Sequence, residues 1–139
     1  MNKSKAQIFL ERVGKIDRII ENKLIEQRQW RDLATRISAN ISDIKVQSSG
    51  CKDKMAEAID KCIDMESEIA HYVDELIAEK REVVKTLEEV YSPTEYNLLH
   101  MRYIQYMRLE DIASVFKKDY GWATTTHGRA LKSLERILE

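Results

Sequence analysis

The chain has 139 residues, of which 34% are charged and 43% hydrophobic, with four glycines and one proline. This length suits one domain or two small ones, and the composition is typical of a helical, soluble protein. No apolar run approaches the roughly 20 residues that a membrane helix needs, and the N-terminal residues lack the apolar core of a secretory signal. We therefore expect an all-α, cytoplasmic protein that contacts no membrane.

The first part of the chain predicts one long helix over about residues 4–46. Apolar residues recur in alternating steps of three and four, which places them on one face of a helix. Lys23 and Gln27 are the polar breaks of this ladder. Its apolar members are Val13, Ile16, Ile20, Trp30, Ala34, Ile37, Ile41 and Ile44.

A second helix of similar length follows the stretch QSSGCKD at residues 47–53, whose turn and capping residues predict a short loop. Its ladder has Glu66 and Lys80 as polar breaks and ends before Pro93. The apolar members are Met55, Ile59, Cys62, Ile69, Val73, Leu76, Val83, Leu87 and Val90. Two matched amphipathic helices joined by a short loop form an antiparallel hairpin, predicted here as a domain over residues 1–90.

Such a hairpin buries one stripe of each helix and leaves a second apolar row uncovered. This row consists of Ile63, Ala70, Ile77 and Val84 on the second helix, with Ile19 and Ile25 on the first. We expect partial cover from a second copy of the chain, which gives a homodimer with a four-helix core. The polar positions Gln27, Glu66 and Lys80 either set register and oligomeric state or sit at a solvated edge, and we favour the edge.

The sequence gives no sign of catalytic or metal chemistry. Cys51 and Cys62 are eleven residues apart, without a histidine at ligand spacing, so we expect reduced thiols and no metal. There is no Gly-rich phosphate loop, no nucleophile motif and no carboxylate pair with a histidine partner. We therefore expect a protein that is not an enzyme and uses no cofactor.

Residues 91–139 are built differently and predict three shorter helices. Ser92, Pro93 and Glu95 provide an N-cap, a proline at the first helical position and a capping-box acid. RLEDIASVF predicts a short amphipathic helix, KKD turns the chain, and Asp119 can cap a last helix. The inward positions of that helix are Ala123, Thr126 or His127, Ala130, Leu134 and Ile137. A short helix, a tight turn and a longer helix form the helix-turn-helix plan.

Four pieces of this segment, SPTE, LLHMRY, LEDIASVF and RALKSL, occur in this order. With this spacing the segment resembles the fourth conserved region of bacterial primary sigma factors, a helix-turn-helix that reads the upstream promoter element. The whole chain is similar to a family of small phage and prophage proteins of Gram-positive bacteria, long filed as of unknown function. IDRIIENKLIEQRQWRDLATRIS, DKMAEAIDKCIDMESEI and RYIQYMRLEDIA carry that similarity. Members are described as sigma-factor-like and sit near the ArpU and RinA types of late-gene activator.

This resemblance implies a phage-type transcription regulator that contacts double-stranded DNA, with RNA polymerase as a further candidate partner. In the sigma fold the N-terminal half of the last helix enters the major groove. The positions that would face bases here are Tyr120, Gly121, Thr124, Thr125 and Gly128. Candidate phosphate contacts are Lys117, Lys118, Arg129, Lys132 and Arg136. Sigma factors carry Arg, Glu and Gln at several base-facing positions, so their promoter preference does not transfer to this chain.

The charge of the segment keeps a second reading open. Residues 91–139 hold seven basic and six acidic side chains, whereas dedicated DNA binders are usually more basic. The alternative is a non-catalytic interaction or assembly factor that keeps the sigma-like scaffold without reading DNA and presents Tyr120, Trp122 and Leu109 to a protein. A phage packaging subunit is a third reading. On either of the first two, we expect His127 to be partly buried and hydrogen-bonded, and Trp122 to pack on the segment's own helices.

Overall fold

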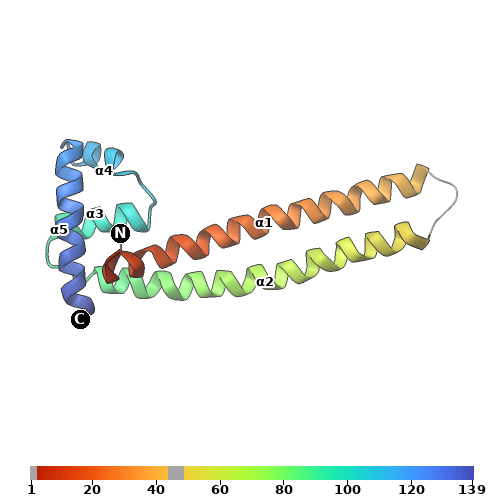
Figure 1. Ribbon diagram of the computed structural model, residues 1–139, viewed down its shortest axis with the longest axis horizontal. Coiled ribbons are helices and arrows are strands. Elements are labelled where there is room, and N and C mark those ends of the chain that lie inside the picture. The colour runs from red at the N-terminus through yellow and green to blue at the C-terminus, as the bar shows by residue number, and fades with distance from the viewer. Residues whose placement is uncertain (1–2, 44–48) are drawn as a thin grey trace. The chain divides into compact units, whose positions relative to one another are not determined.

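The computed structural model describes residues 3–43 and 49–139 of the chain. These residues form helices and no strand, so the predicted all-α fold is confirmed (Figure 1). The helices are α1 (Lys5–Asp43), α2 (Ser49–Leu87), α3 (Pro93–Tyr103), α4 (Leu109–Val115) and α5 (Tyr120–Leu138). None of the helices in the described ranges combines the length and the apolar character needed to cross a membrane.

The two long helices agree with the predicted hairpin, because α1 and α2 each contain 39 residues. The turn predicted at residues 47–53 is too long on its C-terminal side. The helix begins at Ser49, so Gly50 and Asp53 lie within its first turns. The strong helix formers that follow, from Met55 onward, explain why the helix reaches back this far. Residues 44–48, with Ile44 and Ser48, lie outside the described residues.

Packing divides the chain into two compact units. One contains Met1–Ile16 and Glu75–Glu139, and the other contains Asp17–Asp74. The first unit therefore includes the start of α1 and the end of α2 together with α3, α4 and α5. The predicted domains 1–90 and 91–139 follow the order of the chain rather than this packing, and they stay a prediction.

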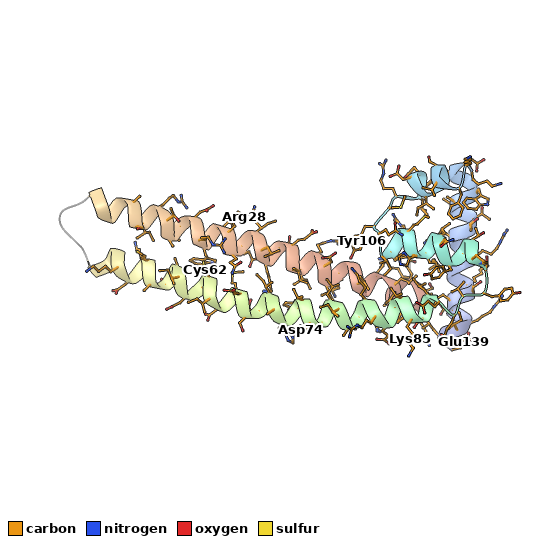
Figure 2. All side chains as sticks on the ribbon, turned by 180° about the vertical axis from the view of Figure 1, so that it is seen from behind. Arg28, Cys62, Asp74, Lys85, Tyr106 and Glu139 are labelled. Atoms are coloured by element: carbon orange, nitrogen blue, oxygen red, sulfur yellow. The ribbon has the colours of Figure 1, made fainter. Side chains whose placement is uncertain are left out.

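In the Asp17–Asp74 unit, a buried amide of α1 bonds to α2 at Cys62, which is labelled in Figure 2. Gln27 is 8% exposed, and its Nε2 donates a hydrogen bond to the backbone oxygen of Cys62 at 3.1 Å. The Cys62 thiol donates back to the backbone oxygen of Gln27 at 3.7 Å. Buried polar groups persist where they are hydrogen-bonded, so the solvated edge predicted for Gln27 is wrong, and this pair fixes the register of the two helices.

An exposed ion pair joins the same two helix segments. Lys23 Nζ lies 2.9 Å from a carboxylate oxygen of Glu68 and 5.6 Å from the centre of the Tyr72 ring. The hydrogen bond raises the pKa of Lys23 and lowers the pKa of Glu68. The polar break of the α1 ladder at Lys23 is thus explained by a partner on α2.

In this unit, every second inward position of α2 lies one residue before the corresponding position of the predicted ladder. Ala58 and Met65 are buried, whereas Ile59 is 41% exposed and Val73 is 37% exposed. Glu66 is exposed as well, which agrees with the solvated edge predicted for it. Both rows have steps of three and four, so periodicity alone does not choose between them. The residues that face inward here are Met55, Ala58, Cys62, Met65, Ile69 and Tyr72.

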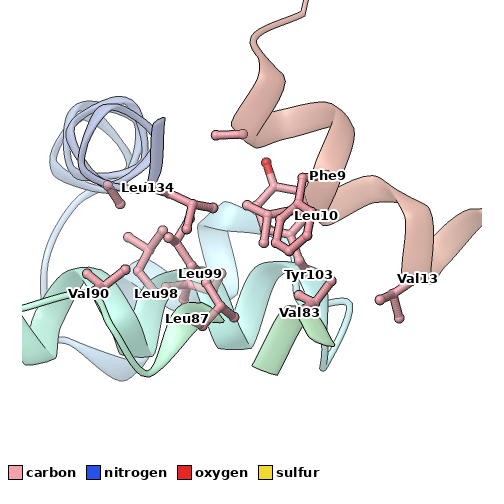
Figure 3. Close-up of a cluster of buried hydrophobic side chains, with 13 residues drawn as sticks. Phe9, Leu10, Val13, Val83, Leu87, Val90, Leu98, Leu99, Tyr103 and Leu134 are labelled. Atoms are coloured by element: carbon pink, nitrogen blue, oxygen red, sulfur yellow. The ribbon is translucent and has the colours of Figure 1, made fainter. Parts of the chain in front are cut away.

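The core of the other unit joins all five helices (Figure 3). Leu10 of α1, Leu87 of α2, Leu99 of α3, Ile112 of α4 and Leu134 of α5 are fully buried. The remaining core members are Ala6, Phe9, Val13, Val83, Val90, Leu98, Tyr103 and Ala130. The start of α1 and the end of α2 therefore share one hydrophobic core with the three shorter helices.

The start of α3 forms as its cap residues predict. The Ser92 hydroxyl accepts a hydrogen bond from the Glu95 backbone nitrogen at 3.3 Å, and Pro93 is the first helical residue. The Glu95 side chain is used differently from a capping-box acid, because its carboxylate accepts the Ser133 hydroxyl of α5 at 2.7 Å. This contact ties α3 to the middle of α5.

Candidate nucleic-acid interface

The turn between α4 and α5 is held by two backbone hydrogen bonds. Lys117 donates to Ser114 at 3.1 Å, and Lys118 donates to Ala113 at 2.9 Å, which is the Schellman arrangement. Lys117 has a φ of 58°, at the position where glycine is the usual residue. A left-handed conformation costs a non-glycine residue about 1 kcal/mol. The chain thus keeps an exposed lysine at a position where glycine would be more stable, and a second exposed lysine follows it.

The first turn of α5 is capped by Asp119, as predicted. Its carboxylate accepts a hydrogen bond from the Trp122 backbone nitrogen at 2.8 Å. Trp122 is half-buried and its ring lies 5.1 Å from that of Phe116, so it packs within the unit as expected. The side of α5 that faces the core is formed by Ala123, Thr126, Ala130 and Leu134, all buried.

The predicted contact residues all lie on the solvent side of α5 or in the turn before it. Every one of the ten is exposed. The base-facing set is Tyr120, Gly121, Thr124, Thr125 and Gly128, and the phosphate set is Lys117, Lys118, Arg129, Lys132 and Arg136. One continuous helix thus presents small and hydroxyl side chains along its first half and basic side chains along its second half.

The hydroxyls on this face differ in their availability. The Thr124 hydroxyl donates to the backbone oxygen of Gly121 at 2.9 Å, so its methyl group and its oxygen lone pairs are left for a ligand. Thr125 forms no side-chain hydrogen bond within the described ranges. Of the two, Thr125 therefore has the more adaptable donor and acceptor.

The two glycines of α5 have no packing reason to be glycine. A Cβ added to Gly128 would meet no atom within 4 Å, and one added to Gly121 would meet only the Asp119 carboxylate, at 3.6 Å. Each glycine in a helix interior costs about 1 kcal/mol relative to alanine. Both glycines of α5 therefore lie on its exposed face, and the core requires neither of them.

The acidic residues of the segment are mostly engaged in structural contacts. Glu95 accepts the Ser133 hydroxyl, and Asp119 caps α5. Glu110 and Asp111 lie 3.9 and 3.4 Å from Arg108. In contrast, none of the five basic residues of the phosphate set forms an ion pair with any residue that the structure describes. The near-neutral sum therefore conceals a face whose basic side chains are unpaired.

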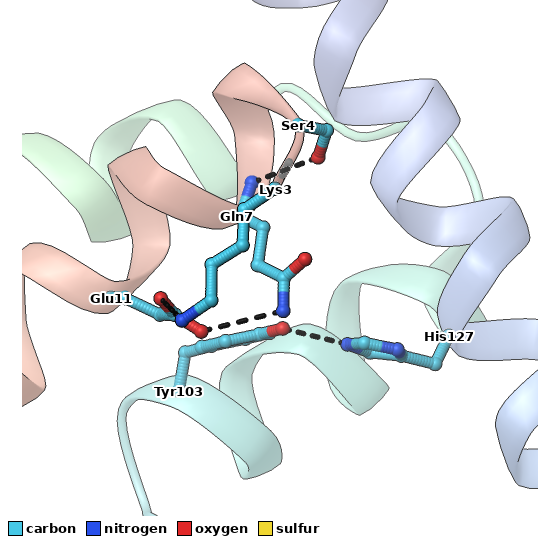
Figure 4. A network of polar contacts seen from close by, with 6 residues as sticks. All are labelled: Lys3, Ser4, Gln7, Glu11, Tyr103 and His127. Carbon is cyan, nitrogen blue, oxygen red and sulfur yellow. Dashed lines mark hydrogen bonds and ion pairs between the residues drawn. The ribbon is translucent and has the colours of Figure 1, made fainter. Parts of the chain in front are cut away.

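Beneath this face, a polar pair links α3 to α5 (Figure 4). The Tyr103 hydroxyl lies 2.7 Å from Nε2 of His127, whose half-buried, hydrogen-bonded state was expected. Burial raises the pKa of Tyr103 to about 12. Burial, with a smaller effect of the Arg102 charge, lowers the pKa of His127. The imidazole and the tyrosine hydroxyl thus share one hydrogen bond. Arg102 donates to the backbone oxygen of Met107 at 3.0 Å.

The fold should lose stability in mild acid because of this pair. The unfolded chain binds a proton at His127 near the ordinary pKa of about 6.5, whereas the folded chain binds it only at lower pH. The unfolding free energy therefore falls as the pH drops from about 6.5 toward the folded-state pKa. Urea titrations at several pH values measure this slope, and His127→Gln should flatten it. An equal slope in both proteins would contradict the prediction.

The N-terminus of α1 is held by a side chain of α5, a contact that the sequence reasoning missed. The Glu135 carboxylate accepts a hydrogen bond from the Ala6 backbone nitrogen at 2.9 Å. Nearby, Lys3 pairs with Glu11 at 2.7 Å, and the Ser4 hydroxyl accepts from the Gln7 backbone nitrogen (Figure 4). The apolar stripe at the start of α1 indicated that this segment packs against another element. The charge of Glu135 gave no sign of the hydrogen bond. Glu135 is consequently one more acid that is engaged in the structure.

These features define an all-α protein whose last helix, packed on the core, exposes basic side chains that form no ion pair within the described ranges. Residues 35–139 match the family described as "Protein of unknown function (DUF1492)", and the chain belongs to this family. No curated protein matches the chain, and no solved structure does.

Proposed function

We propose that the protein is a phage-type, DNA-binding transcription regulator of the bacterial cytoplasm that uses α4, the following turn and α5 as a sigma-like helix-turn-helix. The observation that carries this proposal is the charge distribution around α5. The five basic residues on α5 and in the turn before it are exposed and form no ion pair with a described residue, whereas most of the acids nearby are held in structural contacts. A duplex placed against this face would meet cations that need not first break an ion pair.

The division of labour on this face follows from side-chain chemistry. Thr124 and Thr125 can hydrogen-bond to base edges, and their methyl groups can contact a thymine methyl. Arg129, Lys132 and Arg136, with the two lysines of the turn, would neutralise phosphates and fix the position of the helix. A homodimer formed through the hairpin would give two such modules per particle.

The direct test is selection of bound duplexes from a random pool, followed by a salt titration of the affinity. We expect an enriched sequence and a linear fall of log affinity with log salt concentration. The absence of any DNA affinity at low salt would refute the proposal. The base sequence enriched in the selected duplexes would also identify the bases that the threonines contact.

Gly128→Ala separates a functional role of the glycine from helix propensity. The added methyl group has free space, so we expect the unfolding free energy to rise by about 1 kcal/mol. We expect DNA affinity to fall nonetheless, because a Cβ on this face would hold the duplex away. Gly14→Ala is the control: its Cβ would make only an ordinary 3.6 Å contact with Tyr106, and DNA affinity should not change. Unchanged affinity in Gly128→Ala would remove this glycine from the contact surface.

A second candidate is a protein-interaction factor that uses the same scaffold without reading DNA. Two exposed apolar side chains favour it, since Val115 is 55% exposed and Tyr120 is 52% exposed. RNA polymerase is the partner that a sigma-like module would meet. Capture of purified RNA polymerase by the protein, together with no DNA affinity at low salt, would support this function over the first.

A further inference from the structure

The exposed face of α2 carries a second coiled-coil seam that its contact with α1 leaves open. The positions alternate in steps of four and three along one continuous helix, which is the spacing of a and d positions in a coiled coil. Glu66 and Lys80 are its only two polar members. The apolar members are Ile59, Ile63, Ala70, Val73, Ile77 and Val84.

The structure leaves this row accessible for most of its length. Ile63 is 60% exposed and Ile77 is 46% exposed, and Ile59 and Val73 are also among the exposed large hydrophobic residues. Ala70 and Glu66 are exposed, while Lys80 and Val84 are half-buried. Single exposed apolar residues are ordinary, but a periodic row of them marks an interaction surface.

The charges along the row distinguish between possible occupants. In a parallel pair of α2 helices in register, Glu66 would face Glu66 and Lys80 would face Lys80, and like charges in such positions repel. In an antiparallel pair with Ala70 opposite Val73, Glu66 of each helix lies one layer away from Lys80 of the other helix. Opposite charges are then neighbours. The flanking residues Asp60 and Arg81 are also brought together. The row is therefore complementary to its own reversed copy.

We infer that this row binds the same row of a second copy of the chain, with the two α2 helices antiparallel about a two-fold axis near Ala70 and Val73. The apolar side chains of both copies form alternating layers, and two Glu66–Lys80 pairs and two Asp60–Arg81 pairs fix the direction. This inference specifies the surface and the orientation of the proposed homodimer, and it does not depend on DNA binding.

The experiment is sedimentation equilibrium of the full chain without DNA, over a range of protein concentrations. We expect a monomer–dimer equilibrium whose dissociation constant rises roughly 10-fold or more in Ile63→Asp and in Ile77→Asp. Ile8→Asp, which introduces the same charge at an exposed position near the start of α1 (52% exposed), should leave the constant unchanged. Circular dichroism checks that each variant keeps its helix content.

A charge exchange tests the direction. Glu66→Lys and Lys80→Glu should each weaken the dimer, and the double variant should restore it, because the antiparallel contacts are then exchanged rather than lost. In a parallel dimer, each single variant and the double variant would still place like charges opposite each other. The double variant would then not restore the dimer. A monomer at all concentrations, a dimer equally weakened by Ile8→Asp, or the absence of restoration would each overturn the inference. Because no DNA is present, none of these outcomes bears on the proposed DNA binding.

Discussion

Replacing Leu10 by alanine should destabilise the protein by about 3 kcal/mol. Leu10 lies near the beginning of the chain, yet its side chain is fully buried in the core formed with α3, α4 and α5. Deletion of its methyl groups removes buried apolar contacts and leaves a cavity that the packed leucines around it cannot fill. Such a loss is a large part of the 5–15 kcal/mol by which a domain is usually stable.

Urea denaturation followed by circular dichroism measures this effect. Ile25→Ala is the matched control, because Ile25 lies on the same helix but is 48% exposed, and its substitution should change the unfolding free energy by no more than about 0.5 kcal/mol. If Leu10→Ala costs no more than Ile25→Ala, the start of α1 is not part of the core. A single transition in the wild type that moves to lower urea in Leu10→Ala would indicate that the start of α1 unfolds together with α3, α4 and α5.

The local features of the fold were predictable because their signals lie within a few residues of one another. Ser92 and Asp119 cap α3 and α5 as their positions indicated. The burial of Ala123, Ala130 and Leu134 follows from their spacing along α5. The same spacing places the candidate contact residues on the opposite, exposed face of α5. The sequence therefore also predicted which side of α5 is open to a ligand.

The features that the sequence did not reveal depend on which element packs against which. The stripe of Ala6, Phe9, Leu10 and Val13 shows that one face of α1 is buried, but a stripe does not state what covers it. Likewise, two rows of α2 have equivalent spacing, and contacts such as the hydrogen bond between Gln27 and Cys62 show which row faces α1. The near-neutral charge of the last segment likewise does not show which basic side chains are paired, since ion pairs and caps are invisible in a sum.

The DNA-binding proposal makes its strongest prediction for the double variant Arg129→Ala, Lys132→Ala. Both residues are exposed on α5 and neither forms an ion pair in the described part of the chain. Their removal should therefore leave the fold intact. Each phosphate contact contributes about 0.9 to the slope of log affinity against log salt concentration. We expect the slope to decrease by roughly two and the affinity near 0.1 M salt to fall roughly 10- to 100-fold.

The matched control is Arg28→Ala, Arg36→Ala, which removes the same charge from exposed positions on α1. Fluorescence anisotropy with one labelled duplex at several salt concentrations gives both the affinity and the slope. Because phosphate contacts carry no sequence information, the α5 variant should weaken specific and unrelated duplexes alike, whereas Thr125→Ala should reduce the difference between them. An equal loss in the α1 control would mean that only net charge matters. An unchanged slope in the α5 variant would place the phosphates elsewhere. The basic face of α5 would then be left for a different polyanion or an acidic protein surface.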